Sequence, residues 1–240
     1  MPKSVTISAP AKVNLCLDII GKDQSGYHKI QTIFHELSEL ADEVQITESK
    51  QSDNLTMPQH PLKQEDNLAF KALQLVKQRY DITDRYVHIH ITKNIPLAAG
   101  LGGASSDAAA VIKGLNQLWD LRLETEEMQK LAAELGMDVP FFILGGTAFG
   151  THYGERIQPL SRIKGLKVEL IPDRQHRALT ASQYADVDLQ ECGKNTQKTV
   201  KMLEAISRGD TEEIIKNLHN DFGQNLTGSG PTHLFLTTRS

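Results

Sequence analysis

The strongest chemical pattern in this chain is a glycine-rich segment, residues 95–110 (IPLAAGLGGASSDAAA), that leads into a helix. Gly100, Gly102 and Gly103 permit positive φ and a close backbone approach, and Ser105 and Ser106 are expected to cap the helix that follows. Free N–H groups at the positive end of a helix, fronted by glycines and hydroxyls, bind phosphate. The segment lacks the Gly-Lys-Ser/Thr of a Walker A loop and the spacing of a dinucleotide turn. It therefore predicts a phosphate site of another kind, the alternative being a glycine-rich connection without a ligand.

Three further places carry residues that could do chemistry. Lys12 and Asn14 are two apart on a predicted strand, so they share a face and could hold phosphate oxygens or steer a hydroxyl; the alternative is an exposed polar edge. Asp138 follows a helix exit and precedes Val-Pro-Phe-Phe, where a carboxylate would be partly desolvated and could act as a base; the alternative is a plain turn residue. Tyr27 and His28 follow the first strand, where two flat rings could grip a base or a sugar, although packing is the alternative.

These residues need elements to position them, and the apolar periodicity predicts a mixture of strands and helices. Alternation predicts half-buried strands at residues 13–19, 29–37, 44–47, 86–92 and 167–171. Helices are expected from a cap at Asp66 to about Tyr80, after the glycine segment, over 125–135, and twice within 196–219, the last opened by Asp210. His88 and His90 share one face of a strand, where a solvated or stacked pair is favoured over a metal pair because no third ligand is evident.

Bulk composition narrows the class of protein. A chain of 240 residues can bury a full core in one large or two small domains. A formal net charge of −4 disfavours a nucleic-acid binder, which would carry a basic face. The sequence contains no apolar run of membrane-spanning length and only two cysteines, with Cys16 expected to be a buried thiol. These features predict a soluble, cytoplasmic protein with no membrane or nucleic-acid partner.

Taken together, the motifs resemble those of the GHMP kinase superfamily. The resemblance rests on segments 9–15 (APAKVNL), 26–28 (GYH), 66–68 (DNL), 95–110, 136–141 (GMDVPF), 220–222 (NDF) and 228–232 (GSGPT). It implies an α+β fold: a ribosomal-S5-like, ATP-binding N-terminal domain over residues 1–158 and a ferredoxin-like C-terminal domain over residues 159–240. It also implies transfer of phosphate from ATP, with Mg²⁺ assisting, to a hydroxyl of a small molecule that carries a cytidine diphosphate group.

The same resemblance assigns roles to individual residues. Asp138 matches the general base and Lys12 its electrostatic partner, which agrees with the need of phosphoryl transfer for a proton acceptor and a cation. The implied ATP contacts are Asn67, Lys93, Pro96, Ala98, Ala99, Gly100, Leu101, Gly102, Gly103, Ala104, Ser105 and Ser106. The implied substrate contacts are Asn14, Tyr27, His28, Thr180 and Tyr184, with His28 meeting the cytosine. No residue is assigned as a metal ligand.

The sequence departs from the family pattern in two places. Ala104 stands where a third glycine is usual, and Asp221 is almost adjacent to Gly228, where a helix usually intervenes. The C-terminal domain is therefore expected to be abbreviated, in a monomer or weak homodimer. Two alternatives remain: a sister kinase of the superfamily acting on a mevalonate-, homoserine- or sugar-type substrate, and a catalytically impaired nucleotide-binding relative.

Overall fold

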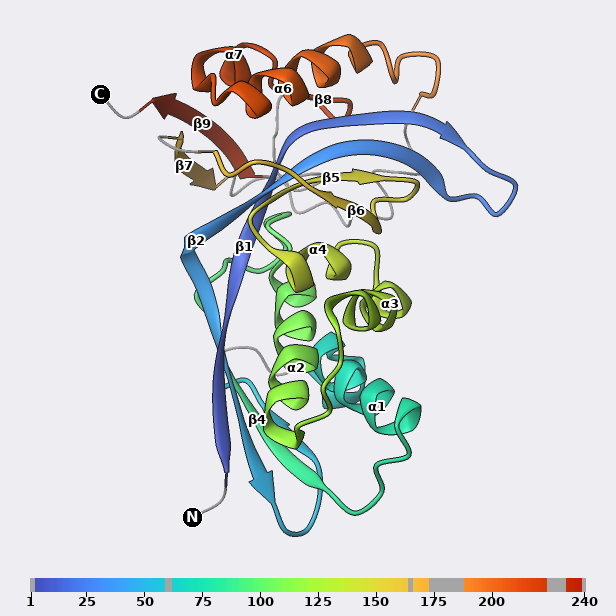
Figure 1. The fold of residues 1–240 in the computed structure, drawn as a ribbon, viewed down its shortest axis with the longest axis vertical. Helices are drawn as coiled ribbons and strands as arrows, with labels where there is room; N and C mark the ends of the chain where they lie inside the picture. The colour runs from blue at the N-terminus through green and yellow to red at the C-terminus, as the bar shows by residue number, and fades with distance from the viewer. Residues whose placement is uncertain (1–2, 59–61, 164–165, 173–187, 224–231, 239–240) are drawn as a thin grey trace. The chain divides into compact units, whose positions relative to one another are not determined.

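Two very long strands organise the computed structural model, which describes residues 3–58, 62–163, 166–172, 188–223 and 232–238 (Figure 1). The strands are β1 (Ser4–Lys22), β2 (His28–Ser49), β3 (Asn54–Thr56), β4 (Tyr86–Thr92), β5 (Thr147–Thr151), β6 (Arg156–Pro159), β7 (Leu166–Pro172), β8 (His219–Asn220) and β9 (Thr232–Thr238). The α-helices are α1 (Leu68–Arg79), α2 (Gly103–Trp119), α3 (Thr125–Leu135), α4 (Val139–Leu144), α6 (Thr196–Arg208) and α7 (Thr211–Lys216). The predicted strands at 29–37 and 44–47 are thus parts of one strand, β2.

The chain divides into two compact units that are interleaved in sequence. The first unit holds residues 1–11, 38–96 and 102–144, and the second holds residues 12–37, 97–101 and 145–240. Both β1 and β2 pass through the two units, so each long strand contributes one segment to either unit. The predicted domains, 1–158 and 159–240, follow chain order, and this division stays a prediction.

The first unit is a sheet covered by helices on one side (Figure 1). Its strand β4 pairs antiparallel with the end of β2, with Ile89 opposite Ile46, and parallel with β3. Ile46 and Ile89 are fully buried beneath the helices. Gly114 on α2 allows the helix to pack closely here: a Cβ there would lie only 2.6 Å from Cδ1 of Ile46, which would have to shift.

Two helix starts differ from the sequence prediction. Asn67, not Asp66, caps α1: its Oδ1 accepts from the backbone N–H of Ala69 at 2.9 Å, while Asp66 lies in a short 3₁₀ turn, η1 (Gln64–Asp66). Helix α2 begins at Gly103 after a left-handed Gly102, so Ser105 and Ser106 lie inside the first turn and do not cap it. The glycines let the helix begin at least three residues before the predicted start, because Gly102 reaches φ 74° without a steric penalty.

The second unit joins its strands in two groups. The first part of β2 pairs antiparallel with β5, β5 pairs with β6, and β8 lies parallel to β1. Strands β7 and β9 form a separate antiparallel pair. Helices α6 and α7 appear as predicted, and Asp210 caps α7 by accepting from the N–H of Glu213. Phe222 packs against a small core of Leu17, Ile19 and Ile30, which gives the Asn-Asp-Phe segment a structural role.

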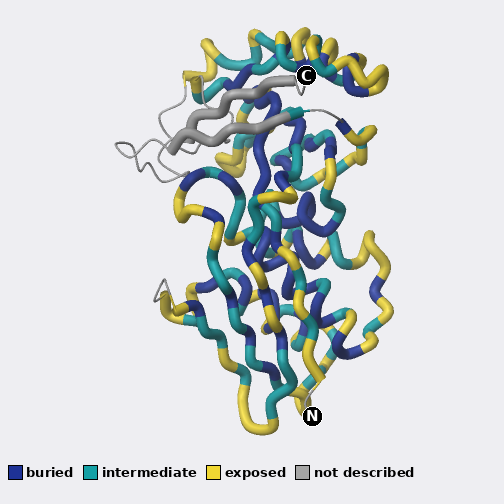
Figure 2. The backbone as a smooth tube through the Cα atoms, turned by 90° about the vertical axis from the view of Figure 1, so that its left-hand side faces the viewer, coloured by how far each residue is buried: buried dark blue, intermediate teal, exposed yellow. Residues whose placement is uncertain are grey.

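Strand β1 corrects the expectation of a half-buried strand. Every residue from Ala11 to Ile19 is buried, the polar ones included (Figure 2). The alternating residues Lys12, Asn14 and Asp18 can be buried because each is hydrogen-bonded within its surroundings. Cys16 is the buried thiol that was predicted, and burial raises its pKa to about 12.

No helix in the described part of the chain is both long and apolar enough to cross a membrane.

Candidate active site

The glycine segment forms the predicted turn into α2. Ala98, Gly100 and Gly102 all have positive φ, of 55°, 76° and 74°. Left-handed residues that alternate with other backbone conformations turn successive N–H groups toward one side, which makes a concave anion site. Ala98 is the costly member, because it has a Cβ and still adopts the left-handed conformation. Backbone strain of this kind persists where the surroundings hold it and is common at functional sites.

The first turn of α2 adds the helix dipole and an unused hydroxyl. The N–H of Ser106 makes the first helical hydrogen bond, to the carbonyl of Gly102 at 2.9 Å. Its side-chain Oγ is buried and has no hydrogen-bond partner among the described residues. A buried hydroxyl without a partner costs free energy, and an anionic oxygen at this helix end would satisfy it. The geometry fits a phosphate group.

Lys12 lies at the start of a buried polar chain in the second unit. Its Nζ donates to Oδ1 of Asn14 at 2.7 Å, and Nδ2 of Asn14 donates to Oγ1 of Thr32 at 2.6 Å. The Thr32 hydroxyl then donates to the carbonyl of Cys16 at 2.6 Å. This chain fixes both predicted side chains in one orientation and excludes the exposed polar edge.

Lys12 is also tied to the glycine segment. Its backbone N–H donates to the carbonyl of Leu101 at 2.9 Å, so the strand and the loop are joined within the second unit. Its ammonium lies 5.5 Å from the centre of the Phe34 ring, over its face. A buried lysine above an aromatic ring is a well-placed cation for an anionic ligand.

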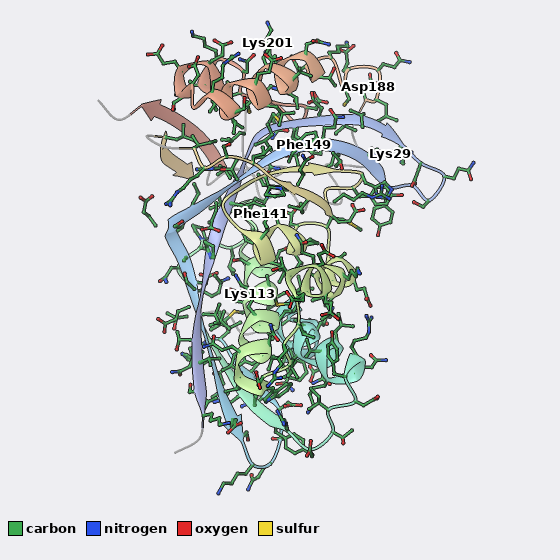
Figure 3. The ribbon with its side chains drawn as sticks, in the orientation of Figure 1. Lys29, Lys113, Phe141, Phe149, Asp188 and Lys201 are labelled. Carbon is green, nitrogen blue, oxygen red and sulfur yellow. The ribbon has the colours of Figure 1, made fainter. Side chains whose placement is uncertain are left out.

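Asp138 is half-buried and directly precedes α4 in the first unit. Helix α4 is fixed against α2, because Nζ of Lys113 donates to the carbonyl of Phe142 at 3.1 Å. Figure 3 shows Lys113 on α2 and Phe141 on α4, in the packed part of this unit. Phe141 and Phe142 meet edge to face, with ring centres 5.2 Å apart. The aspartate thus precedes a rigid element, as a positioned base requires.

Tyr27 ends the turn between β1 and β2, and His28 is the first residue of β2. Tyr27 is 55% exposed, which leaves its side chain open for stacking. Burial, with a smaller contribution from Lys22, lowers the pKa of His28. A neutral imidazole has one donor and one acceptor nitrogen, which suits the edge of a nucleobase.

Sequence reasoning missed a third ring beside this turn. Tyr153, between β5 and β6, lies 5.3 Å from Tyr27 between ring centres and 3.8 Å from His152. Its hydroxyl donates to the carboxylate of Asp23, which also accepts from the N–H and hydroxyl of Ser25. Tyr153 stands far from Tyr27 in the sequence, and no local pattern there marks it.

Asn67 and Lys93, the expected adenosine contacts, already have internal partners. Oδ1 of Asn67 caps α1, so an adenosine contact would have to come from its Nδ2. The Lys93 ammonium binds the carboxylates of Asp42 and Asp107 and is 4% exposed. A contact from Lys93 to adenosine would therefore use its backbone. Sequence reasoning missed Asp42 and Asp107, although Asp107 directly follows the two serines of the glycine segment.

The remaining predicted contacts are placed as follows. Pro96, Ala98 and Ala104 are exposed on the glycine segment, whereas Ala99 and Leu101 are buried and hold it in place. Thr180 and Tyr184 lie outside the described residues. His88 and His90 do not show a metal pair: both rings hydrogen-bond the Thr56 hydroxyl at 2.9 Å.

Comparison with known proteins decides the family. Residues 67–146 match the family model described as the GHMP kinases N-terminal domain. The 4-diphosphocytidyl-2-C-methyl-D-erythritol kinase of Shouchella clausii is 41% identical over 90% of this chain and 71% of that protein. The enzyme of the same name from Bacillus licheniformis is 39% identical over 93% of this chain and 85% of that protein.

The chain belongs to the GHMP kinases.

Solved structures of GHMP kinases agree with this assignment. A crystal structure of a 4-(cytidine 5′-diphospho)-2C-methyl-D-erythritol kinase matches with a TM-score of 0.69 and 32% identity, covering 86% of this chain and 72% of that one. Homoserine kinase from Cytophaga hutchinsonii matches with a TM-score of 0.75 over 99% of this chain and 86% of that one. At 18% identity, the second match supports the fold alone. The predicted α+β GHMP kinase fold is confirmed.

Proposed function

We propose that this GHMP kinase transfers the γ-phosphoryl group of ATP to the 2-hydroxyl of 4-diphosphocytidyl-2-C-methyl-D-erythritol, a step in the synthesis of isoprenoid precursors. The observation that carries this proposal is the identity of 41% to a kinase of this name over 90% of the chain. The buried Lys12–Asn14–Thr32 chain and the glycine segment support a phosphoryl-transfer site, and the Tyr27–His28 turn supports a substrate with a nucleobase.

The glycine segment would bind the triphosphate. Backbone N–H groups of residues 98–105 and the buried Ser106 hydroxyl offer donors for phosphate oxygens. Within the described residues, no three acidic, histidine or cysteine side chains gather as a metal site. This suits Mg²⁺ that arrives on ATP, since Mg²⁺ keeps several waters and is held largely by substrate phosphates. When bound, Mg²⁺ would neutralise charge on the phosphates.

Asp138 and Lys12 would act on the reacting groups. Asp138 would accept the proton of the 2-hydroxyl as its oxygen attacks the γ-phosphorus, and the bond from that phosphorus to the leaving oxygen of ADP would break. Lys12 would offset the negative charge that grows on the transferring group. Asn14 holds the Lys12 ammonium by accepting its hydrogen bond, which limits the lysine to one orientation.

The turn at Tyr27 and His28 would bind the cytosine. The exposed Tyr27 ring offers a stacking face, and the neutral His28 ring could read the base edge. Thr180 and Tyr184 are proposed as further substrate contacts on the strength of the family resemblance alone. A monomer or weak homodimer is the proposed assembly.

A coupled assay of ADP release tests the substrate assignment. We expect turnover with the cytidyl substrate and none above background with mevalonate or homoserine. Asp138→Asn should lower kcat by about 10²–10⁴-fold, because general-base assistance contributes that much, while calorimetry should find ATP binding nearly intact. Asp120→Asn is the matched control: it makes the same change of side chain in the same unit, at an exposed carboxylate that pairs with Arg122. Preference for mevalonate or homoserine would overturn the proposal in favour of a sister kinase.

A further inference from the structure

A buried cluster of three charged side chains lies under the first turn of α2. Asp42 comes from β2, Lys93 from the segment after β4, and Asp107 from α2 itself. The Lys93 ammonium donates to both carboxylates, to Oδ2 of Asp107 at 2.7 Å. The side chains are at most 4% exposed. One cation therefore links the strand, the entry to the glycine segment and the helix.

Asp42 also fixes the backbone that enters the glycine segment. Its Oδ1 accepts from the N–H groups of Asn94 at 2.6 Å and Ile95 at 2.8 Å. These bonds set the direction of the chain just before Pro96. Further along the segment, Gly103 lies against the same ammonium, since a Cβ there would approach Nζ of Lys93 to 3.3 Å. The cluster thus holds the residues on both sides of the predicted phosphate site.

The charges in this cluster do not balance. Two carboxylates share one ammonium, and Oδ1 of Asp107 is buried without a hydrogen-bond partner among the described residues. The charged groups that act most strongly on Asp107 are Lys93, from the segment after β4, and Asp42, from β2. Burial is the largest cause of a pKa raised to about 7 at Asp107; Lys93 opposes the rise and Asp42 adds to it.

An incoming triphosphate would add negative charge at the same end of α2. An ionised Asp107 would repel it, whereas a protonated Asp107 would not. Protonation would also leave Asp42 and Lys93 as a balanced pair. We propose that Asp42 and Lys93 are positioning residues for the phosphate-binding end of α2, and that Asp107 takes up a proton when ATP binds. This inference rests on the proposed function, because it assumes that the glycine segment binds ATP.

Calorimetric titration of the full chain with ATP, in two buffers of different ionisation enthalpy, tests the proton uptake. The difference between buffers gives the number of protons taken up per ATP. The number of protons taken up per ATP should be larger for the unsubstituted protein than for Asp107→Asn. The difference should be a fraction of a proton near pH 7 and should approach one proton above it. Protons that ATP itself gains or loses on binding are the same for both proteins, so they cancel when the two proton numbers are subtracted. Equal proton numbers in the two proteins would overturn the role of Asp107.

Asp42→Asn tests the positioning role. The amide oxygen of asparagine can accept from the backbone N–H groups, but its amide nitrogen cannot accept from the Lys93 ammonium. We expect a dissociation constant for ATP raised by roughly ten- to a hundredfold, with the KM for the second substrate nearly unchanged. Asp53→Asn is the matched control. Asp53 likewise accepts from a lysine, Lys77 at 2.6 Å, and from a backbone N–H, that of Val87 at 3.0 Å.

The outcomes separate the two proposals. Equal loss of ATP affinity in Asp42→Asn and Asp53→Asn would show a general loss of stability and overturn the positioning role. Should Asp42→Asn fail to fold, the proton number of Asp107→Asn is the deciding measurement. This variant should fold, because its amide oxygen can still accept a hydrogen bond from Lys93. If the unsubstituted protein bound no ATP, the proposed function would fail and this inference with it.

Discussion

The two units each bury a charged cluster, and the clusters are built differently. In the first unit, Asp42 and Asp107 share the single ammonium of Lys93. In the second, Asp18 pairs with His219, from Nε2 to Oδ1 at 3.0 Å, and its other oxygen accepts from the Thr199 hydroxyl at 2.5 Å. Both clusters lie almost entirely out of water, yet only the first has an excess of one charge.

In the second cluster, which consists of Asp18, Thr199 and His219, every polar side-chain atom has a hydrogen-bond partner, so we call it the closed cluster. Nδ1 of His219 lies 2.8 Å from the carbonyl of Asn217, which can only accept, and Nε2 faces a carboxylate oxygen. With Asp18 ionised, both ring nitrogens donate, and this arrangement favours the protonated imidazole. The pKa of His219 is raised: burial lowers it, but the hydrogen bonds that the ring donates to Asp18 and Asn217, with the charge of Asp18, outweigh burial.

The contrast suggests what each cluster is for. The closed cluster joins β1, α6 and β8 and has every polar atom satisfied, as a structural network requires. The first cluster, Asp42, Lys93 and Asp107, we call the open cluster, because Oδ1 of Asp107 has no hydrogen-bond partner among the described residues. Asp107 follows a loop that contains left-handed residues. Unbalanced buried charge is costly, and here it accompanies the predicted phosphate site.

Removing the shared cation should have the largest effect on stability. Lys93→Met leaves two carboxylates buried without a counter-charge, so the free energy of unfolding should fall by about 3–5 kcal/mol. Urea denaturation followed by circular dichroism measures it. Lys77→Met, which breaks the more exposed pair with Asp53, is the control and should cost less. Equal losses would remove the distinction between the open cluster and an ordinary ion pair.

The pH dependence of stability should distinguish the clusters next. The pKa of folded Asp107 is raised to about 7, whereas an unfolded aspartate loses its proton near its ordinary pKa of 3.8. The folded state thus binds more protons in this interval, and the unfolding free energy falls as the pH rises through it, by a few kcal/mol at most. Asp107→Asn should flatten this slope in urea titrations across the interval. If the slope of the unfolding free energy against pH were the same in Asp107→Asn, another group than Asp107 would titrate in this interval.

The closed cluster should lose its contribution at higher pH. Because the pKa of folded His219 is raised above 6.5, its stabilisation is complete below that value and is lost as the pH rises through the folded pKa. Asp18→Asn removes the charged partner and should cost about 1.5–3 kcal/mol below pH 6.5 and less in alkaline buffer. ATP affinity should not change. A loss that did not depend on pH would mean that the folded imidazole is neutral.

The smallest expected effect is at the Thr199 hydroxyl. Thr199→Val keeps the shape and removes one hydrogen bond to Asp18, so it should cost about 1–2 kcal/mol. Thr125→Val, at the exposed start of α3, should change stability by less and serves as the control. If Thr199→Val were neutral, Asp18 would be satisfied without the hydroxyl and the closed cluster would be smaller than described.

The sequence by itself determined the glycine turn, the helix after it and the identity of the chemical groups. Glycine and serine before an apolar helical stretch act locally, through backbone freedom and the helix dipole. Their role can therefore be predicted without knowledge of the tertiary structure. The two-residue spacing of Lys12 and Asn14 likewise placed both on one face of β1. The family could be inferred for the same reason, since its motifs are short and local.

Tertiary structure alone decided which charges meet. Asp42 and Lys93 are 51 residues apart, and Asp18 and His219 are 201 apart, so no local pattern pairs them. The burial of both faces of β1 was equally hidden, because alternation of polar and apolar residues predicts one wet face. Polar residues can be buried when the fold supplies partners, and those partners come from distant strands and helices. Side-chain pairing across the fold, rather than residue type, therefore determines which cluster is closed and which is open.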